Sequence, residues 1–214
     1  MIKAVLFDMD GVLVDSEEFI RKAAILMFKE LGLEVKHEDF FEFIGAGEDR
    51  FLGGVAEKYN FSFYIPTGKK RTYEIYSELI KNNLTPLPGV HSFIKKCRDK
   101  GLKIAMATSA DRTKMKSNLG EIGISENTFD AVVTALDVRR QKPFPDIYLK
   151  AADIIGEDIN NCLVVEDAIN GVRAAKDAGA KCLGLTTSFG KEQLSEADWF
   201  AENLSKAKDE VFNW

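Results

Sequence analysis

Short apolar runs and amphipathic segments alternate along most of the chain. Five runs of four to six residues have the length and composition of buried strands; they cover Lys3–Phe7, Lys103–Thr108, Ala131–Thr134, Cys162–Glu166 and Lys181–Leu185. The segments between the later runs have the spacing of amphipathic helices, over residues 91–100, 112–122, 145–155 and 170–178. Strands that alternate with helices predict a doubly wound α/β fold, in which a parallel sheet is covered on both faces.

The alternation breaks between the first two predicted strands. No buried strand is predicted from Asp15 to about Thr85, while residues 17–32 have a strong helical pattern and further helices are expected around 38–44, 48–58 and 69–82. The stretch "TPLPGV" at 85–90 marks the return to alternating strands and helices. We therefore predict an α/β core domain formed by residues 1–14 and 86–214, with a helical cap domain, residues 15–85, inserted in the first crossover. Two adjacent linkers would join them.

Composition narrows the class of protein. The chain has 214 residues, of which 45% are hydrophobic and 29% charged, and its formal net charge is −5. These values are typical of a soluble globular protein, and they disfavour nucleic acid as a partner because that usually requires a basic face. No run approaches the ~20 apolar residues of a membrane span. The odd number of cysteines, three, and their wide spacing argue against a disulfide framework. We expect buried thiols, a cytoplasmic location, no membrane partner, and a monomer or weak dimer.

Two acidic pairs stand at predicted strand ends. Asp8 and Asp10 follow the first strand, and Glu166 and Asp167 end the fourth. In an open α/β sheet the carboxyl ends of the strands meet at one edge, where ligands bind. Converging carboxylates repel each other unless a cation lies between them, and oxygen ligands suit Mg²⁺. The sequence therefore predicts a magnesium site formed by these four residues.

Further polar groups at the same edge suit a phosphate. Thr108 and Ser109 end the second strand and Ala110 comes next; hydroxyls and main-chain N–H groups there can hold phosphate oxygens close to a helix N-terminus. Lys142, in "RRQKPFPD", offers a positive charge that can neutralise developing negative charge. A carboxylate nucleophile, a metal, hydroxyl donors and a lysine together suit phosphoryl transfer, in which positioning and electrostatics do most of the catalysis.

Four segments, "FDMDGVLVDSE", "ATSAD", "KPFPDIY" and "VVEDAINGV", resemble in order the motifs of the haloacid dehalogenase-like superfamily. The resemblance covers almost the whole chain and is nearest to the β-phosphoglucomutase-like and related phosphatase branch with a helical cap. It implies that Asp8 attacks phosphorus to form an aspartyl phosphate, and that Asp10 acts as general acid and then as general base. It also implies that Asp10 binds Mg²⁺ through its main-chain carbonyl, with Asp167 and Glu166 completing the site. Thr108 and Lys142 match the phosphate-binding hydroxyl and lysine.

The resemblance implies a Mg²⁺-dependent phosphatase that acts on a small phosphorylated metabolite, such as a sugar phosphate. A sugar-phosphate mutase is the first alternative. The mutases of this branch typically carry a histidine where this chain has Ile20, and an arginine in the cap loop that Arg50 matches only approximately. A phospho-accepting receiver module and a catalytically silent binding protein are the non-enzyme alternatives. Turnover of a phosphate ester with Mg²⁺ separates the enzymes from the others.

The glycine-rich stretch "GAGEDRFLGG", residues 45–54, has two interpretations. It is not a nucleotide-binding loop, because Arg50 stands in place of the third glycine and no strand precedes it. It is either a turn before a helix or a cap loop that contacts substrate through Glu48 or Arg50. Loops often carry specificity, so both residues are candidates for substrate binding.

Overall fold

A six-stranded parallel sheet forms the centre of the computed structural model, which describes residues 2–43 and 47–214. The strand order is β3-β2-β1-β4-β5-β6. The strands are β1 (Ala4–Phe7), β2 (Lys103–Ala107), β3 (Ala131–Val133), β4 (Cys162–Glu166), β5 (Lys181–Leu185) and β6 (Trp199–Ala201). All neighbouring strands run parallel, which confirms the predicted doubly wound sheet.

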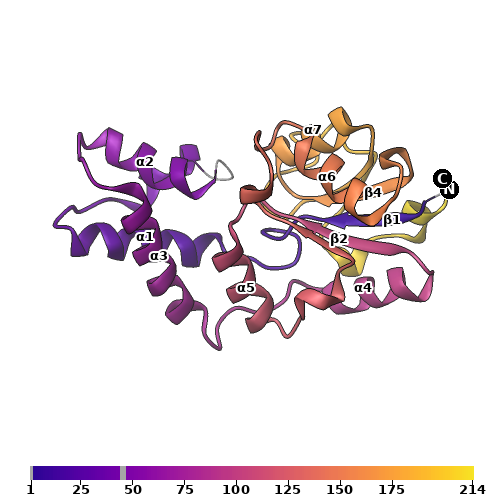
Figure 1. Cartoon of the computed structure of the whole chain (residues 1–214), viewed down its shortest axis with the longest axis horizontal. Coiled ribbons are helices and arrows are strands. Elements are labelled where there is room, and N and C mark those ends of the chain that lie inside the picture. The colour runs from indigo at the N-terminus through magenta and orange to yellow at the C-terminus, as the bar shows by residue number, and fades with distance from the viewer. Residues whose placement is uncertain (1, 44–46) are drawn as a thin grey trace.

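Helices cover both faces of the sheet (Figure 1). One face packs against α4 (Val90–Asp99) and α5 (Arg112–Glu121), and the other against α6 (Asp146–Ile155) and α7 (Ile169–Ala178). Alternate residues of β1 point to opposite faces, so Phe7 lies in one core and Leu6 in the other. Because both faces are covered, the run "AVLF" is buried throughout.

A second group of helices lies beside the sheet, at the left of Figure 1. It comprises α1 (Glu17–Glu30), the 3₁₀ helix η1 (His37–Phe43), α2 (Glu48–Lys58) and α3 (Ile65–Ile80). Buried aromatic rings join these helices: Phe28 of α1 packs against Phe40 of η1, and Phe40 packs against Phe51 of α2. The chain between β1 and β2 is therefore helical, as the break in the alternation indicates.

The two chain crossings between the helical group and the sheet lie side by side. Val14 pairs with Pro86 in an antiparallel bridge, and the Leu87 amide donates to the Leu13 carbonyl at 2.9 Å. This pairing lies at the predicted boundaries 14/15 and 85/86, and it supports our division of the chain into core and cap. We keep that division as a proposal and refer to residues 15–85 as the cap.

The structure differs from the predicted elements in three places. The short strand β6 was not predicted, because it has only three residues, of which Trp199 and Phe200 are partly buried and Ala201 is buried, and they carry no alternation to recognise. The segment expected to be a helix at 38–44 forms the 3₁₀ helix η1, and Ile44 lies outside the described residues. Helix α3 begins at Ile65, four residues before the expected start, because Pro66 occupies its first turn, where proline is well accommodated.

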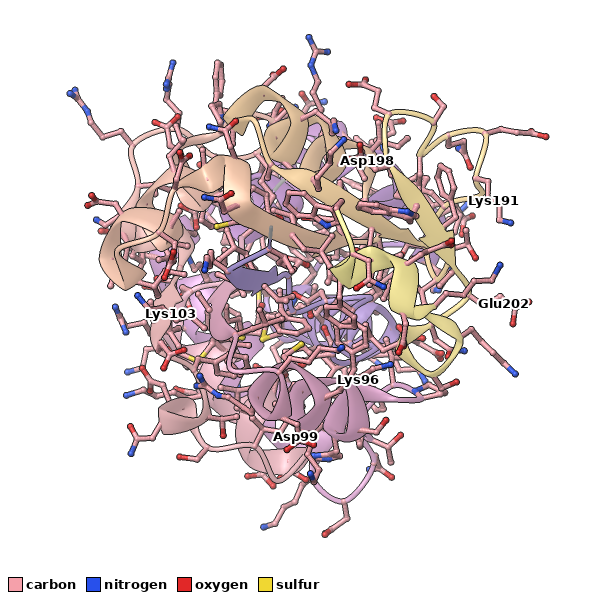
Figure 2. The ribbon with its side chains drawn as sticks, turned by 90° about the vertical axis from the view of Figure 1, so that its right-hand side faces the viewer. Lys96, Asp99, Lys103, Lys191, Asp198 and Glu202 are labelled. Carbon is pink, nitrogen blue, oxygen red and sulfur yellow. The ribbon has the colours of Figure 1, made fainter. Side chains whose placement is uncertain are left out.

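Figure 2 views the core from the end opposite the cap and labels Asp198, which precedes β6. Its carboxylate accepts hydrogen bonds from Lys176 at 2.6 Å, Lys181 at 2.8 Å and the Cys182 amide at 2.9 Å. Burial alone would raise the pKa of Asp198, but these hydrogen bonds outweigh it and hold the pKa below its usual value. These three hydrogen bonds hold the residue before β6 next to β5.

The remaining ordered elements are short. They are the 3₁₀ helices η2 (Glu126–Thr128), η3 (Ala135–Asp137), η4 (Ile159–Asn161), η5 (Leu204–Lys206) and η6 (Asp209–Phe212). All three cysteines are buried free thiols, as expected from their spacing. Over residues 2–43 and 47–214, no helix has the length and apolar character needed to cross a membrane.

Candidate active site

The loop after β1 separates the two aspartates of the first motif. The Asp8 amide donates to the Val165 carbonyl at 3.0 Å, which holds Asp8 at the end of the sheet. The Met9 carbonyl then accepts the amides of residues 12–14, and this tight turn points Asp8 and Asp10 to different partners. Asp8 pairs with Lys142, whereas Asp10 pairs with Lys114. The two close carboxylates therefore have a lysine each.

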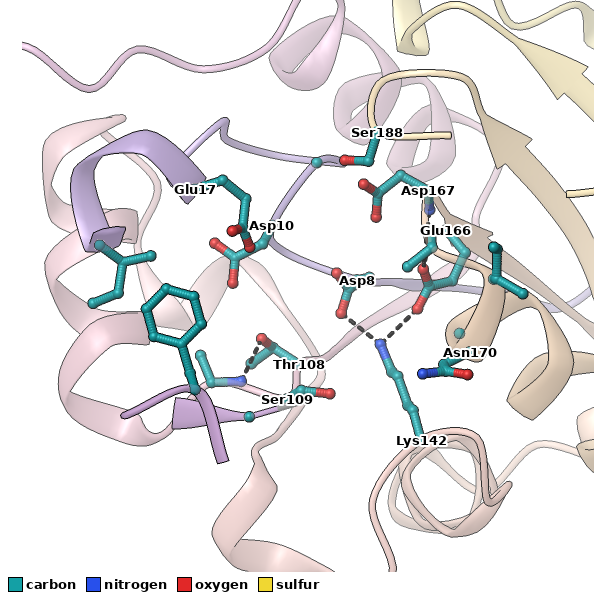
Figure 3. Close-up of a pocket in the computed structure, with 18 of the residues that line it drawn as sticks. Asp8, Asp10, Glu17, Thr108, Ser109, Lys142, Glu166, Asp167, Asn170 and Ser188 are labelled. Atoms are coloured by element: carbon teal, nitrogen blue, oxygen red, sulfur yellow. Dashed lines mark hydrogen bonds and ion pairs between the residues drawn. The ribbon is translucent and has the colours of Figure 1, made fainter. Parts of the chain in front are cut away.

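Lys142 is buried at the centre of the site (Figure 3). Its ammonium group lies 2.6 Å from Oδ1 of Asp8 and 2.6 Å from Oε1 of Glu166, and it also donates to the Ala107 carbonyl at 3.3 Å. Burial alone would lower the pKa of Lys142, but the two carboxylates outweigh it and raise that pKa. Lys142 thus stays charged and joins three strand ends.

The second acidic pair ends β4. Glu166 is held from several sides: Oε2 accepts the amides of Asp167 at 2.9 Å and Ala168 at 3.1 Å, while Oε1 accepts the Tyr148 hydroxyl at 2.6 Å. Asp167 lies opposite Gly11, where an added Cβ would come within 1.8 Å of Oδ2. Gly11 also has a φ of +72°, so the close approach of this carboxylate to the first motif depends on a glycine there.

Three of the four predicted metal ligands form one buried group. Carboxylate oxygens of Asp8, Glu166 and Asp167 all lie within 4.8 Å of one another. Burial raises the pKa of Asp8 to about 7, with Glu166 adding to the rise and Lys142 opposing it. Burial and the neighbouring carboxylates also raise the pKa of Asp167 well above its usual value. A group of crowded oxygen donors with a single lysine fits a hard cation such as Mg²⁺.

The fourth predicted ligand, Asp10, directs its carboxylate elsewhere. Its oxygens accept hydrogen bonds from the Ser16 hydroxyl and from Lys114, the latter at 2.9 Å. Only its main-chain carbonyl remains a candidate for the metal, as the family resemblance implies. The side chain of Asp10 faces the cap side of the cavity and is available to move a proton.

The predicted phosphate-binding segment lines the same cavity. Thr108, Ser109 and Ala110 all contribute to its wall, and the hydroxyl of Thr108 accepts the Ala110 amide at 3.1 Å. Helix α5 begins directly after, with the Asp111 carboxylate capping the amides of Thr113 and Lys114. The structure thus brings the segment to the edge of the sheet that carries Asp8 and Lys142.

The two cap candidates have different surroundings. Glu48 lines the cavity and lies 3.5 Å from the ammonium group of Lys114. Arg50 is not among the described lining residues: its guanidinium pairs with Glu57 at 2.7 Å and stacks on the ring of Phe43. The structure does not bring Arg50 to the site, because it lies on the exposed side of α2. Gly45 and Ala46 lie outside the described residues.

Lys114 is the main site residue that sequence reasoning missed. It is only 4% exposed and contacts Asp10 of the core and Glu48 of the cap. Burial alone would lower its pKa, but these carboxylates outweigh it and raise that pKa. Lysine in the first turn of a helix opposes the helix dipole, so its place three residues after the Asp111 cap could have indicated a special role.

The cavity itself encloses about 250 Å³ between the core and the cap. Further lining residues that sequence reasoning did not assign to the site are Glu17, Asn170, Ser188 and Phe189, and Ile20 lines it too. Burial raises the pKa of Glu17 and of Glu48, with Lys114 opposing the rise in both. Asp8 and Lys142 thus line the cavity together with the acidic residues Asp10, Glu17 and Glu48.

Residues 5–185 match the model of a family described as haloacid dehalogenase-like hydrolases. The chain belongs to this family. A phosphorylated carbohydrates phosphatase of Thermotoga maritima is 31% identical over 182 residues, which are 83% of this chain and 82% of that protein. The chloroplastic protein SUPPRESSOR OF QUENCHING 1 of Arabidopsis thaliana is 43% identical over 199 residues, 92% of this chain, but this chain spans only 19% of that protein's length.

A solved structure supports the same assignment. CbbY from Rhodobacter sphaeroides, in complex with xylulose-(1,5)bisphosphate, is 25% identical and has a TM-score of 0.85 over 96% of each chain. The matches confirm the predicted family, the Rossmann-like fold and the class of enzyme, a hydrolase.

Proposed function

We propose that this protein is a Mg²⁺-dependent phosphatase that acts on a small phosphorylated metabolite through an aspartyl phosphate on Asp8. The observation that carries the proposal is the position of Asp8 on the cavity floor, paired with Lys142 and beside Glu166 and Asp167. Relatives named as phosphatases support the reaction class.

The proposed reaction has two steps. A carboxylate oxygen of Asp8 attacks phosphorus while the bond from phosphorus to the ester oxygen breaks, and Asp10 donates a proton to the leaving oxygen. Water then attacks phosphorus, Asp10 accepts the proton of that water, and the bond to Asp8 breaks to release phosphate. The hydroxyls of Thr108 and Ser109 line the cavity and can donate to phosphate oxygens, while the Ala110 amide orients the Thr108 hydroxyl and Lys142 offsets the phosphate charge.

The metal has a matching set of donors. Asp8, Asp167 and the main-chain carbonyl of Asp10, with Glu166 nearby, would hold Mg²⁺, which when bound offsets the negative charges of the carboxylates and the phosphate. Lys142 alone leaves this carboxylate group with an excess of negative charge. Burial raises the pKa of Asp8 and Glu166 adds to the rise, so an ionised nucleophile there calls for a second cation.

A sugar-phosphate mutase is the second candidate. Such an enzyme would transfer the phosphoryl group from Asp8 to a second hydroxyl of the sugar, which needs a base beside that hydroxyl and room for a bisphosphate. Ile20, at the position where mutases of this branch typically carry a histidine, is buried in the cavity wall and offers neither proton donor nor acceptor. The apolar side chain of Ile20 therefore favours a phosphatase over a mutase. The receiver and silent-binding alternatives fit a hydrolase family less well.

The test is phosphate release from p-nitrophenyl phosphate and a panel of sugar phosphates, with Mg²⁺ and with EDTA. We expect turnover only with Mg²⁺, none in Asp8→Asn, and near-native rates in the control Asp15→Asn, whose side chain is exposed in the same loop. Isomerised product, followed in parallel, would indicate the mutase. Full activity in EDTA, or in Asp8→Asn, would exclude the proposed mechanism. Cytoplasmic location and a monomeric or weakly dimeric state stay predictions.

A further inference from the structure

The part of the cavity that faces the cap has an unusual balance of charge. Beyond the phosphate-binding residues, its described wall carries the carboxylates of Asp10, Glu17 and Glu48, and one lysine, Lys114. Apolar side chains of Ile20, Phe43 and Phe51 complete this wall. A substrate whose phosphate lies above Asp8 would place its organic group against these residues. We call them the leaving-group wall.

The basic side chains that line the cavity are already paired. Among the described lining residues the only basic side chains are Lys114 and Lys142. Lys142 is bound by Asp8 and Glu166, and Lys114 by Asp10 at 2.9 Å with Glu48 at 3.5 Å. Outside the cavity Arg50 pairs with Glu57. The leaving-group wall thus has no basic side chain to spare for a second anionic group on the substrate.

The acidic residues, by contrast, have acceptor capacity to spare. Oε2 of Glu17 is buried without a hydrogen-bond partner in the described part of the chain. Figure 3 shows the Glu17 side chain beside Asp10, on the side of the cavity away from Lys142. Glu48 contributes a carboxylate that is 11% exposed and lies 3.5 Å from the ammonium group of Lys114. Buried acceptors without donors are costly, so a bound hydroxyl or ammonium group would relieve the cost.

We infer that the leaving-group wall selects phosphate monoesters whose organic group is an uncharged or cationic polyol, and rejects substrates that carry a second phosphate or a carboxylate. Glu17 and Glu48 accept hydrogen bonds from hydroxyl or ammonium groups of the substrate. The rings of Phe43 and Phe51 pack against the C–H groups of its carbon skeleton. Lys114 positions Glu48 and Asp10 and is not free to bind an anion. This inference rests on the proposed phosphatase function and names its substrate class.

The experiment compares phosphate esters of matched size that differ in charge. We expect kcat/KM for glucose 6-phosphate and glucosamine 6-phosphate to exceed that for 6-phosphogluconate by at least about tenfold, because like charges across a contact repel. For the same reason, kcat/KM for fructose 6-phosphate should exceed that for fructose 1,6-bisphosphate by a similar factor. Glu17→Gln and Glu48→Gln should each reduce the ratio of glucosamine 6-phosphate to 6-phosphogluconate by about tenfold, since they remove a charge but keep the shape.

Glu18→Gln is the matched control, because Glu18 is exposed on the same turn of α1 and should leave the ratio unchanged. Dissociation constants for the same compounds, measured by calorimetry with Asp8→Asn, report the selection without turnover. Tighter binding of 6-phosphogluconate or the bisphosphate than of the monophosphates, or ratios unaffected in both variants, would overturn the inference. Absence of p-nitrophenyl phosphate hydrolysis would instead overturn the phosphatase function, while the binding order would still decide the inference.

Discussion

Lys114 forms an ion pair with Asp10, in which Nζ lies 2.9 Å from Oδ2. The lysine belongs to helix α5 of the core, yet it also lies 3.5 Å from Glu48 of the cap helix α2. One buried ammonium group therefore connects the proposed acid–base residue to the cap. Because Asp10 would have to approach the leaving oxygen at a fixed angle, this pair gives the core a means of orienting it.

We predict that the variant Lys114→Met is much less stable than the wild type and hydrolyses phosphate esters more slowly. Removing the lysine of this buried ion pair leaves the carboxylates of Asp10 and Glu48 uncompensated, at a cost of about 3–5 kcal/mol. Urea unfolding measures that loss, and kcat/KM for p-nitrophenyl phosphate should fall by at least about tenfold. Lys116→Met, exposed on the same helix, is the control and should behave like the wild type. Native stability in Lys114→Met would show that the pair contributes nothing.

The second prediction concerns Lys142 and the effect of Mg²⁺ on thermal stability. Lys142→Met leaves the carboxylates of Asp8 and Glu166 without their lysine, so the protein should lose stability in EDTA. Mg²⁺ should then raise the melting temperature of Lys142→Met by more than that of the wild type, because a cation would be the only remaining compensation. Lys191→Met, an exposed lysine labelled in Figure 2, is the control. An equal rise in both proteins would show that Lys142 and the cation do not substitute for each other, and no rise in either would contradict a metal at this carboxylate group.

The raised pKa of Asp8 predicts a pH dependence of stability. In the unfolded chain Asp8 ionises near pH 3.9, whereas in the metal-free folded protein it keeps its proton until about pH 7. Folding therefore retains a proton between these values, and Asp8 lowers stability progressively as pH rises from about 4 to about 7. In EDTA, Asp8→Asn should thus be more stable than the wild type at pH 8 and lose most of that advantage at pH 5.

Thermal unfolding of both proteins at the two pH values measures this difference. Asp15→Asn, exposed in the same loop, should show no pH-dependent gap to the wild type. Added Mg²⁺ at pH 8 should stabilise the wild type and close the gap, because the cation favours the ionised carboxylate. A gap of the same size at pH 5 and pH 8 would mean that Asp8 does not titrate in this range.

Comparison of the prediction with the structure shows where sequence patterns carry information. The buried strands could be predicted because a strand covered on both faces is apolar throughout, as β1 and β4 are. The acidic pairs could be placed together because the carboxyl ends of parallel strands meet at one edge. Strand β6 escaped prediction, since three residues at a sheet edge are too few to show a period.

Contacts between core and cap could not be derived in the same way. Whether Glu48 or Arg50 faces the cavity depends on how α2 is turned against the core, and a one-residue change of helical phase rotates a side chain by about 100°. Lys114 escaped prediction for a similar reason, because its partners Asp10 and Glu48 come from two distant segments of the chain. Tertiary packing, and not local pattern, decides such contacts.

The last prediction concerns the way the cap rests on the core. The Tyr76 hydroxyl, on α3, donates to Oδ1 of Asn118 on α5, and both side chains are fully buried. Tyr76→Phe keeps the ring but leaves Oδ1 of Asn118 without its hydrogen-bond donor, which should lower the free energy of unfolding by about 1–3 kcal/mol. Because the contact joins cap to core, its loss should also shift the cap toward an open state and raise KM more than it lowers kcat. Steady-state kinetics and urea unfolding measure both effects, and Tyr64→Phe, 73% exposed, is the control. An unchanged KM with lowered stability would show that Tyr76 only packs the interface and does not govern closure.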